Sequence, residues 1–292
     1  MRAWRRWRVG GSTSIAPAGD GDELPRFGAR WAVALFLAFL LLGVLYTLPL
    51  VAHITDAVPF AAVPTPHHEL TWRAQGDHLQ FYYYLWLVRD RLRAGASIFR
   101  DPYQFSVNGP HWNLPNTFLP FTLLYLPLSL LGPRLAYNLL VLLSFPLAGL
   151  TTALLAHRYG LSRWAALAAG TVFACAPYRI GALLGGHPAG LAYFLVPLAL
   201  WGLEGALAGS VGGGAWCGVA LLSIALVEPH FLYFAALGLP LYVVIRIGLA
   251  GWTRDALRIG ALHWAAALAV AVVPAWATIA RLRQQGWALP LQ

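Results

Sequence analysis

Residues 31–51 read WAVALFLAFLLLGVLYTLPLV, 21 residues without a charged side chain. Two further runs, residues 135–156 and 259–280, have the same character over 22 residues each. Uncharged apolar runs longer than about 18 residues are typical of helices that cross a bilayer. We therefore predict an all-α protein, a polytopic transmembrane helical bundle.

The composition of the whole chain supports a membrane protein. Hydrophobic residues make up 59% of the 292 residues and charged residues 11%, with a mean hydropathy of +0.62. A soluble domain has about a quarter of its residues charged. The net charge of +9 comes from Arg alone, since the chain has no Lys. Six Arg residues precede the first run, which predicts a cytoplasmic N-terminus in contact with headgroups and argues against nucleic-acid binding.

The chain divides into a tail and a membrane domain. Residues 1–29 are rich in Gly, Pro and Arg, and we expect a mobile cytoplasmic tail; residues 30–292 form the transmembrane domain. Residues 52–116 are predicted to be the first outer loop. Within that loop, residues 77–93 are crowded with aromatics suited to the headgroup level, which predicts an interfacial helix that stops near Gly95.

Residues 118–131 leave the topology open, because the segment is apolar but short and contains Pro120 and Pro127. If it is a re-entrant or interfacial helix, the basic turns fall inside and the chain has seven full spans. The outer face then carries Asp77, His187, Glu228 and His230. The spans after the first are predicted at residues 135–156, 164–178, 188–203, 215–227, 231–245 and 259–280.

Asp77 is the strongest candidate functional residue. The chain has only 11 acidic residues, and a carboxylate at the edge of a bilayer is costly to place. A desolvated carboxylate can serve as a general base. Asp77 also stands where it would cap the helix that follows, and the two roles do not exclude each other.

Four more polar residues lie at predicted span ends. Arg179 suits a lipid phosphate, or else it snorkels to the headgroups. Pro229 interrupts a membrane helix between Glu228 and His230, which favours a site over a smooth lipid-facing surface, although a polar pair bridging two helices is the alternative. His187 lies among Gly and Pro near the same face. A divalent metal site can be drawn from Asp77, His187, Glu228 and His230, but no close-spaced ligand motif supports it, so no metal ligand is predicted.

Two stretches carry a resemblance to a known family. The first is Gly76-Asp77-His78-Leu79-Gln80 with the following Leu92-Arg93-Ala94-Gly95 and Ile98-Phe99-Arg100-Asp101-Pro102-Tyr103. The second is Ala174-Cys175-Ala176-Pro177-Tyr178-Arg179, leading to Gly185-Gly186-His187. Over roughly residues 30–250 the chain resembles the GT-C superfamily of membrane glycosyltransferases. It is distantly similar to oligosaccharyltransferase catalytic subunits and protein mannosyltransferases. The former carry an acidic metal ligand where this chain has His187, which puts metal dependence in doubt.

The resemblance implies an inverting glycosyltransferase of the bacterial inner (plasma) membrane that builds the cell envelope. It would move a sugar from a polyprenyl-phosphate carrier to a glycan, lipid or protein acceptor on the outer face. Asp77 would be the general base and Glu228 a second catalytic carboxylate. His78, Arg179, His187 and His230 would bind substrate. No cofactor is certain, and a divalent metal has no ligand motif to support it. Members of the superfamily are usually longer, so the chain is expected to be a fragment or a short member.

Two other functions stay open at this point. A transporter or flippase for lipid-linked sugars would place charges near mid-span and pair broken helices in two halves. The charges here cluster at span ends, which favours the enzyme. A non-catalytic membrane assembly protein could keep the same fold, but the presence of a carboxylate at Asp77 speaks for catalysis.

Overall fold

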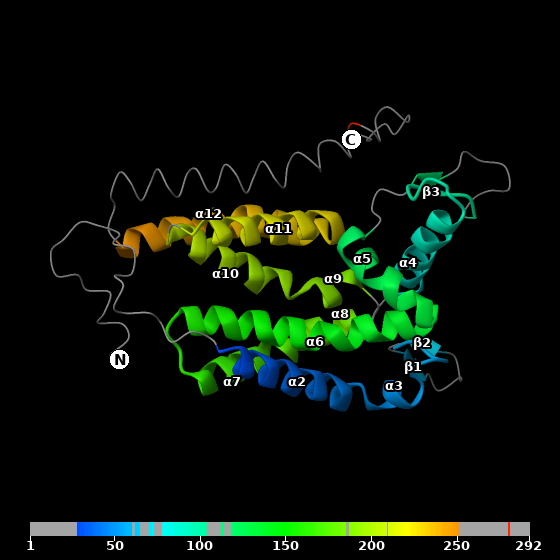
Figure 1. Ribbon diagram of the computed structural model, residues 1–292, viewed down its shortest axis with the longest axis horizontal. Coiled ribbons are helices and arrows are strands. Elements are labelled where there is room, and N and C mark those ends of the chain that lie inside the picture. Colours follow the sequence, from blue (N-terminus) through cyan, green and yellow to red (C-terminus); the bar gives the residue numbers. More distant parts are fainter. Residues whose placement is uncertain are drawn as a thin grey trace.

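The computed structural model of the chain describes residues 28–59, 62–64, 70–72, 78–103, 112–113, 118–184, 187–208, 210–250 and 280. The described part is a helical bundle with two short strand pairs at one end (Figure 1). Asp77, the tail before Gly28 and all but one residue of the predicted span at 259–280 lie outside the described residues.

Three stretches of helix are long and apolar enough to cross a membrane, and they mark the chain as a membrane protein. The described part contains a fourth if two helices bent by 42° count as one broken span. The three are α2 (Ala29–Tyr46), α6 (Pro133–Arg158), and α9 (Pro188–Ala192) with α10 (Leu195–Leu207). The bent pair is α7 (Arg163–Ala174) and α8 (Pro177–Leu184).

The predicted count of seven spans is met only in part. The helices α11 (Val211–Val227) and α12 (Pro229–Ala250) occupy the predicted runs at 215–227 and 231–245. The 17 residues of α11 are about 26 Å long, somewhat short of a hydrocarbon core of about 30 Å. The apolar part of α12, His230–Arg246, is similarly short. Seven spans therefore remain a prediction, while the all-helical bundle is confirmed in the described part.

Small residues bring the helix backbones into contact. A Cβ added to Gly170 on α7 would lie 2.5 Å from the carbonyl oxygen of Gly149 on α6. A Cβ on Gly149 would in turn meet the ring of Phe39 on α2 at the same distance. On the other side of the bundle, a Cβ on Gly213 of α11 would reach within 2.6 Å of Ala206 on α10. Close approach at small residues is how helices pack in membranes, and here it stacks α2 and α7 on α6, and α10 on α11.

The ambiguous segment at 118–131 forms a short helix. It contains α5 (Leu119–Leu128) and a 3₁₀ turn, η1 (Ser129–Leu131). Together they extend about 21 Å, too short to cross the hydrocarbon core. Figure 1 shows α5 at the same end of the bundle as the helix of the first loop. The predicted short helix is confirmed, and its placement relative to a membrane stays a prediction.

The predicted helix of the first loop is α4 (His78–Arg93), and the chain leaves it through Gly95 at a φ of +62°. That left-handed conformation favours glycine and explains the stop. Phe81 and Tyr84, predicted to meet headgroups, are instead buried in the protein core with Leu85 and Val88. The helix therefore uses part of its aromatic surface to pack on the bundle.

Two antiparallel strand pairs were not predicted. The first joins β1 (Ala62–Pro64) to β2 (Leu70–Trp72), with Val63 opposite Thr71. The second joins β3 (Arg100–Asp101) to β4 (Trp112–Asn113), with Asp101 opposite Trp112. Strands of two or three residues are too short to show the alternation by which a sequence reveals a strand.

A polar network joins the helices at the end of the bundle away from α4. The carboxylate of Glu204 on α10 accepts two hydrogen bonds from Arg246 on α12, from Nε to Oε1 and from Nη2 to Oε2, each at 2.6 Å. The hydroxyl of Tyr242 also donates to Glu204. The Tyr159 hydroxyl, just past the end of α6, lies 2.5 Å from that of Tyr242. The network ties α12 to α10 and to the end of α6.

Candidate functional site

The structure brings three of the predicted site residues together, and we call them the Glu–His cluster: His187, Glu228 and His230. Glu228 Oε1 lies 2.6 Å from His230 Nδ1, and Glu228 Oε2 lies 3.4 Å from His187 Nδ1. The carboxylate is buried, with its side chain 4% exposed, whereas the His187 and His230 side chains are 38% and 82% exposed. Burying a carboxylate is costly unless other groups contact it. His187 and His230 provide these contacts for Glu228.

The junction between α11 and α12 positions Glu228 and His230. Glu228 ends α11, with its backbone N–H donating to the Ile224 carbonyl at 2.8 Å. Pro229 begins the next helix, a position where its missing N–H costs nothing. The Glu228 carboxylate then accepts the backbone N–H of His230 at 3.3 Å. A carboxylate at a helix N-terminus is favoured by the helix dipole, so the same residue ends one helix and stabilises the start of the next.

His187 reaches the cluster from another pair of helices. It is the N-cap of α9, and its backbone N–H donates to the Ala182 carbonyl of α8 at 2.9 Å. Its Nδ1 accepts the Ala189 N–H at 3.2 Å. Because Ala182 lies on α8 and Ala189 on α9, His187 is held between these two helices while its ring faces Glu228.

The contacts of the cluster constrain where its protons lie. Nδ1 of His230 faces a carboxylate oxygen at 2.6 Å, so it carries the hydrogen, and Nε2 of the neutral ring is left as an acceptor. Nδ1 of His187 faces both an N–H group, which needs its lone pair, and a carboxylate, which needs its proton. The same ring nitrogen of His187 therefore contacts both the N-terminus of α9 and the Glu228 carboxylate.

The other predicted site residues are placed differently. Asp77 lies outside the described residues, and of His78 the structure describes only the backbone, which begins α4. Arg179 is 0% exposed and makes its contacts inside the protein. Its Nη1 donates to the Ala174 carbonyl at 2.6 Å and its Nη2 to the Ser144 hydroxyl at 2.5 Å. A side chain buried in this way does not snorkel to headgroups, and its predicted contact with a phosphate stays a prediction.

The helix that follows Asp77 shares its end of the bundle with the Glu–His cluster. Phe118, just before α5, stacks edge-on against Phe81 of α4, with 4.6 Å between the ring centroids. The helix α5 packs against α4 on one side and α11 on the other. Since α11 ends at Glu228, α5 connects the first loop to the cluster.

A hydrogen bond from Tyr83 of α4 to Asp101 of β3 tethers these two elements, and the sequence did not predict it. Asp101 Oδ1 accepts a hydrogen bond from the backbone N–H of Tyr103 at 2.8 Å. It is also 0% exposed and accepts the Tyr83 hydroxyl at 2.9 Å. Burial raises the pKa of Tyr83 well above its usual value, and the bond to Asp101 adds to this effect. Nothing local in the sequence links residues 18 positions apart.

A second contact strengthens this tether at the surface. The Tyr103 hydroxyl donates to Asp90 Oδ2 at 2.8 Å, and Arg91 Nη2 donates to the same oxygen at 3.0 Å. The bond from Tyr103 lowers the pKa of Asp90, and Arg91 lowers it further. Asp90 is therefore ionised at neutral pH, and the segment after α4 is held against the helix.

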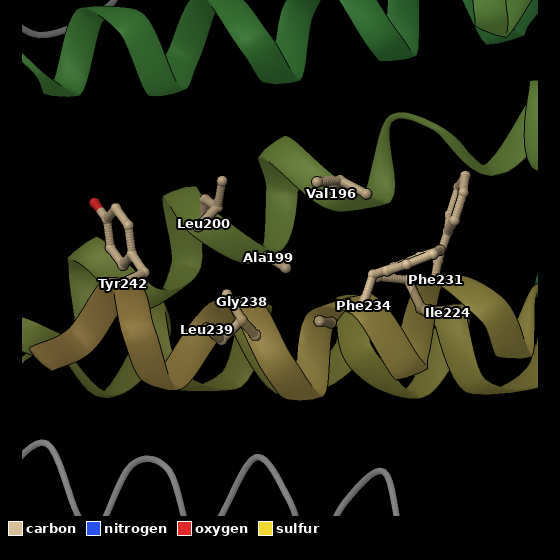
Figure 2. Close-up of a pocket in the computed structure, with 10 residues that line it drawn as sticks. Val196, Ala199, Leu200, Ile224, Phe231, Phe234, Gly238, Leu239 and Tyr242 are labelled. Atoms are coloured by element: carbon tan, nitrogen blue, oxygen red, sulfur yellow. The ribbon is translucent and has the colours of Figure 1, made fainter. Parts of the chain in front are cut away.

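An apolar groove begins next to the cluster. It has a volume of about 320 Å³ and lies between α10 and α12 (Figure 2). Val196, Ala199 and Leu200 form its α10 wall. The α12 wall extends from Phe231, the residue after His230, to Tyr242. Its middle is open because Gly238 has no side chain there. The glycine is visible in the sequence, but its place in a groove is known only from the packing of the helices.

The described side chains do not form a metal site. Within the part of the chain that the structure describes, no group of three or more His, Cys, Asp or Glu could hold a metal ion. Cys175 and Cys217 are both free thiols. That the site has no metal ligand stays a prediction.

No family model, curated protein or solved structure matches the chain. The resemblance to the GT-C superfamily therefore rests on the residues that suggested it. The fold and the site together define a helical membrane protein with a buried carboxylate and two histidines at one end of its bundle.

Proposed function

We propose that the protein is an integral membrane glycosyltransferase that moves a sugar from a polyprenyl-phosphate carrier to an acceptor. The observation that carries the proposal is the Glu–His cluster at the end of the bundle where the first loop folds. The reaction would take place on the outer face of a bacterial inner membrane, with the N-terminus in the cytoplasm.

The chemistry needs a group that takes the proton of the acceptor hydroxyl and groups that hold the leaving phosphate. Asp77 is our candidate for the general base. Glu228 would hold His230 so that Nε2 faces the solvent, where it can bond to an acceptor hydroxyl or, when protonated, to the phosphate. His187 would supply a second contact to the substrate. One carboxylate acting on the acceptor is sufficient for inversion at the sugar.

The groove between α10 and α12 favours a lipid-linked substrate over a soluble one. From Phe231 to Tyr242 it follows 11 residues of helix, about 16 Å. A hydrocarbon chain in this groove would end beside His230. A nucleotide sugar has no use for such an apolar surface, whereas the carrier of a lipid-linked sugar has both a chain to bury and a phosphate to present.

A transfer assay tests the proposal directly. Membranes containing the chain would be supplied with a radiolabelled sugar on polyprenyl phosphate or, in parallel, on a nucleotide. We expect transfer from the lipid donor only. Glu228→Gln keeps the size of the side chain but removes the charge that orients both histidines, and we expect it to lower transfer about 10- to 100-fold. Equal transfer by the parent and Glu228→Gln would remove the cluster from the reaction, and transfer from the nucleotide donor would refute the donor class.

Gly238→Leu tests the groove. A Cβ at Gly238 meets no atom within 4 Å, so a side chain begun there has room to extend into the groove. Displacing two or three methylene groups of a bound chain costs about 2 kcal/mol, and we expect the KM for a long-chain donor to rise about 30-fold.

The control for that experiment is Leu237→Phe, which enlarges an exposed residue of the same helix. The KM should change little in this variant, and donors with a very short chain should be used equally well by the parent and Gly238→Leu. An unchanged KM for long-chain donors in Gly238→Leu would place the chain elsewhere.

A further inference from the structure

Arg179 occupies an unusual position for a charged residue. Its guanidinium is completely buried, and it lies over the ring of Phe145 with 4.4 Å from Cζ to the ring centroid. Its hydrogen-bond partners are a hydroxyl and a carbonyl, and among the described residues no carboxylate pairs with it. Its Nε has no hydrogen-bond partner there. A buried cation held by neutral groups is costly, so it must serve a purpose.

Its two hydrogen bonds join three helices at the break in the bent span. Arg179 lies on α8, Ala174 ends α7, and Ser144 lies within α6. The carbonyl of Ala174 is one of those left without an intrahelical partner where α7 stops. A cation at a helix C-terminus also interacts favourably with the dipole. The planar fork of Arg reaches both acceptors at once, which a single ammonium group does less well.

The position of α8 determines where His187 lies in the Glu–His cluster. A Cβ on Gly190 of α9 would lie 2.4 Å from the backbone nitrogen of Leu183, so the backbones of α8 and α9 are in direct contact. His187 is bonded through its N–H to Ala182 of α8. A shift of α8 would therefore carry His187 with it, while Glu228 and His230 are held by α11 and α12.

We propose that Arg179 is a positioning residue, whose bonds to α6 and α7 fix α8 and thereby set the distance from His187 to Glu228. The inference rests on the proposed function only where activity is the readout. It gives Arg179 a role inside the protein and not on the phosphate of a substrate.

Chemical modification of the histidines tests the proposal without an assay of function. The full chain in detergent would be treated with diethyl pyrocarbonate, and modification of His187 and His230 would be measured by mass spectrometry. The variants are Arg179→Gln, Arg179→Lys and Ser144→Ala, the last removing only the hydroxyl that accepts Nη2. We expect the ratio of His187 to His230 modification to rise about tenfold in Arg179→Gln and Ser144→Ala, and less in Arg179→Lys, as hydrogen bonds to a charged group are lost.

The matched control is Thr152→Ala, which removes a hydroxyl of α6 that bonds only to its own helix at Ala148. This variant should leave the ratio unchanged. A general loss of stability would raise the modification of His187 and His230 together, and would overturn the proposal. Should Arg179→Gln fail to fold, Ser144→Ala still decides, because it keeps the arginine.

Kinetics separates the two roles of Arg179. If Arg179 is a positioning residue, Arg179→Gln and Ser144→Ala should lower sugar transfer and raise the modification ratio together. If Arg179 binds the phosphate, the KM rises in Arg179→Gln while the modification ratio stays at the parent value, and the proposal is wrong. If the parent transfers no sugar at all, the proposed function fails, yet the modification ratio still decides the role of Arg179.

Discussion

Asp77→Asn is expected to lower sugar transfer by about 10²- to 10⁴-fold, the contribution of a general base. The amide keeps the size of the side chain but cannot accept a proton. Asn also caps helices about as well as Asp, and α4 begins at the next residue, His78. The substitution therefore separates the two roles that the sequence leaves open. A base is lost in the variant, while a cap is kept.

The measurement is initial-rate transfer from the polyprenyl-phosphate donor, together with the thermal stability of the purified protein. Asp56→Asn is the matched control, because Asp56 is an exposed carboxylate whose described partner is His53. It should transfer sugar at the parent rate. Equal rates for Asp77→Asn and Asp56→Asn would leave Asp77 only a capping role and would direct the search for the base to His230.

Glu204→Ala is expected to destabilise the protein by about 3–5 kcal/mol, the usual cost of removing one partner of a buried ion pair. The carboxylate is buried between α10 and α12 and accepts both hydrogen bonds of the Arg246 fork. Its loss removes the charge that Arg246 and Tyr242 both bind, at the Tyr242 end of the groove. The effect would appear as a large fall in the temperature at which the protein aggregates in detergent.

The double variant Glu204→Leu/Arg246→Leu is the control, because it removes both charges together. It should recover most of the stability, since an ion pair replaced by apolar residues of similar size is often neutral. Tyr242→Phe removes the hydroxyl that bonds to Glu204 and to Tyr159 and should cost about 2 kcal/mol, less than the loss of the carboxylate. A single variant Glu204→Ala as stable as the parent would show that the network contributes little to holding α12.

The local structure of the chain was largely predictable. Uncharged runs gave the positions of α2 and α6, since the need to satisfy backbone groups in a bilayer allows little besides helix. The helix 77–93 and its stop at Gly95 followed from the aromatic and charged pattern and from the freedom of glycine. The break at Pro229 between Glu228 and His230 was also expected, because proline interrupts a membrane helix.

Local sequence patterns do not show which residues that are distant in the chain contact each other. His187 lies 3.4 Å from a carboxylate 41 positions away, because α8 packs closely on α9 at Gly190 and α9 in turn contacts α11, which leads to Glu228. Arg179 looks like a surface cation in the sequence, but it is buried because the break between α7 and α8 offers it a free carbonyl. The groove exists because α12 packs on α11 and meets α10 mainly through Glu204. The hydrophobicity and spacing of neighbouring residues are enough to specify each helix. How the helices pack against each other depends on the shapes of side chains that are distant in the sequence.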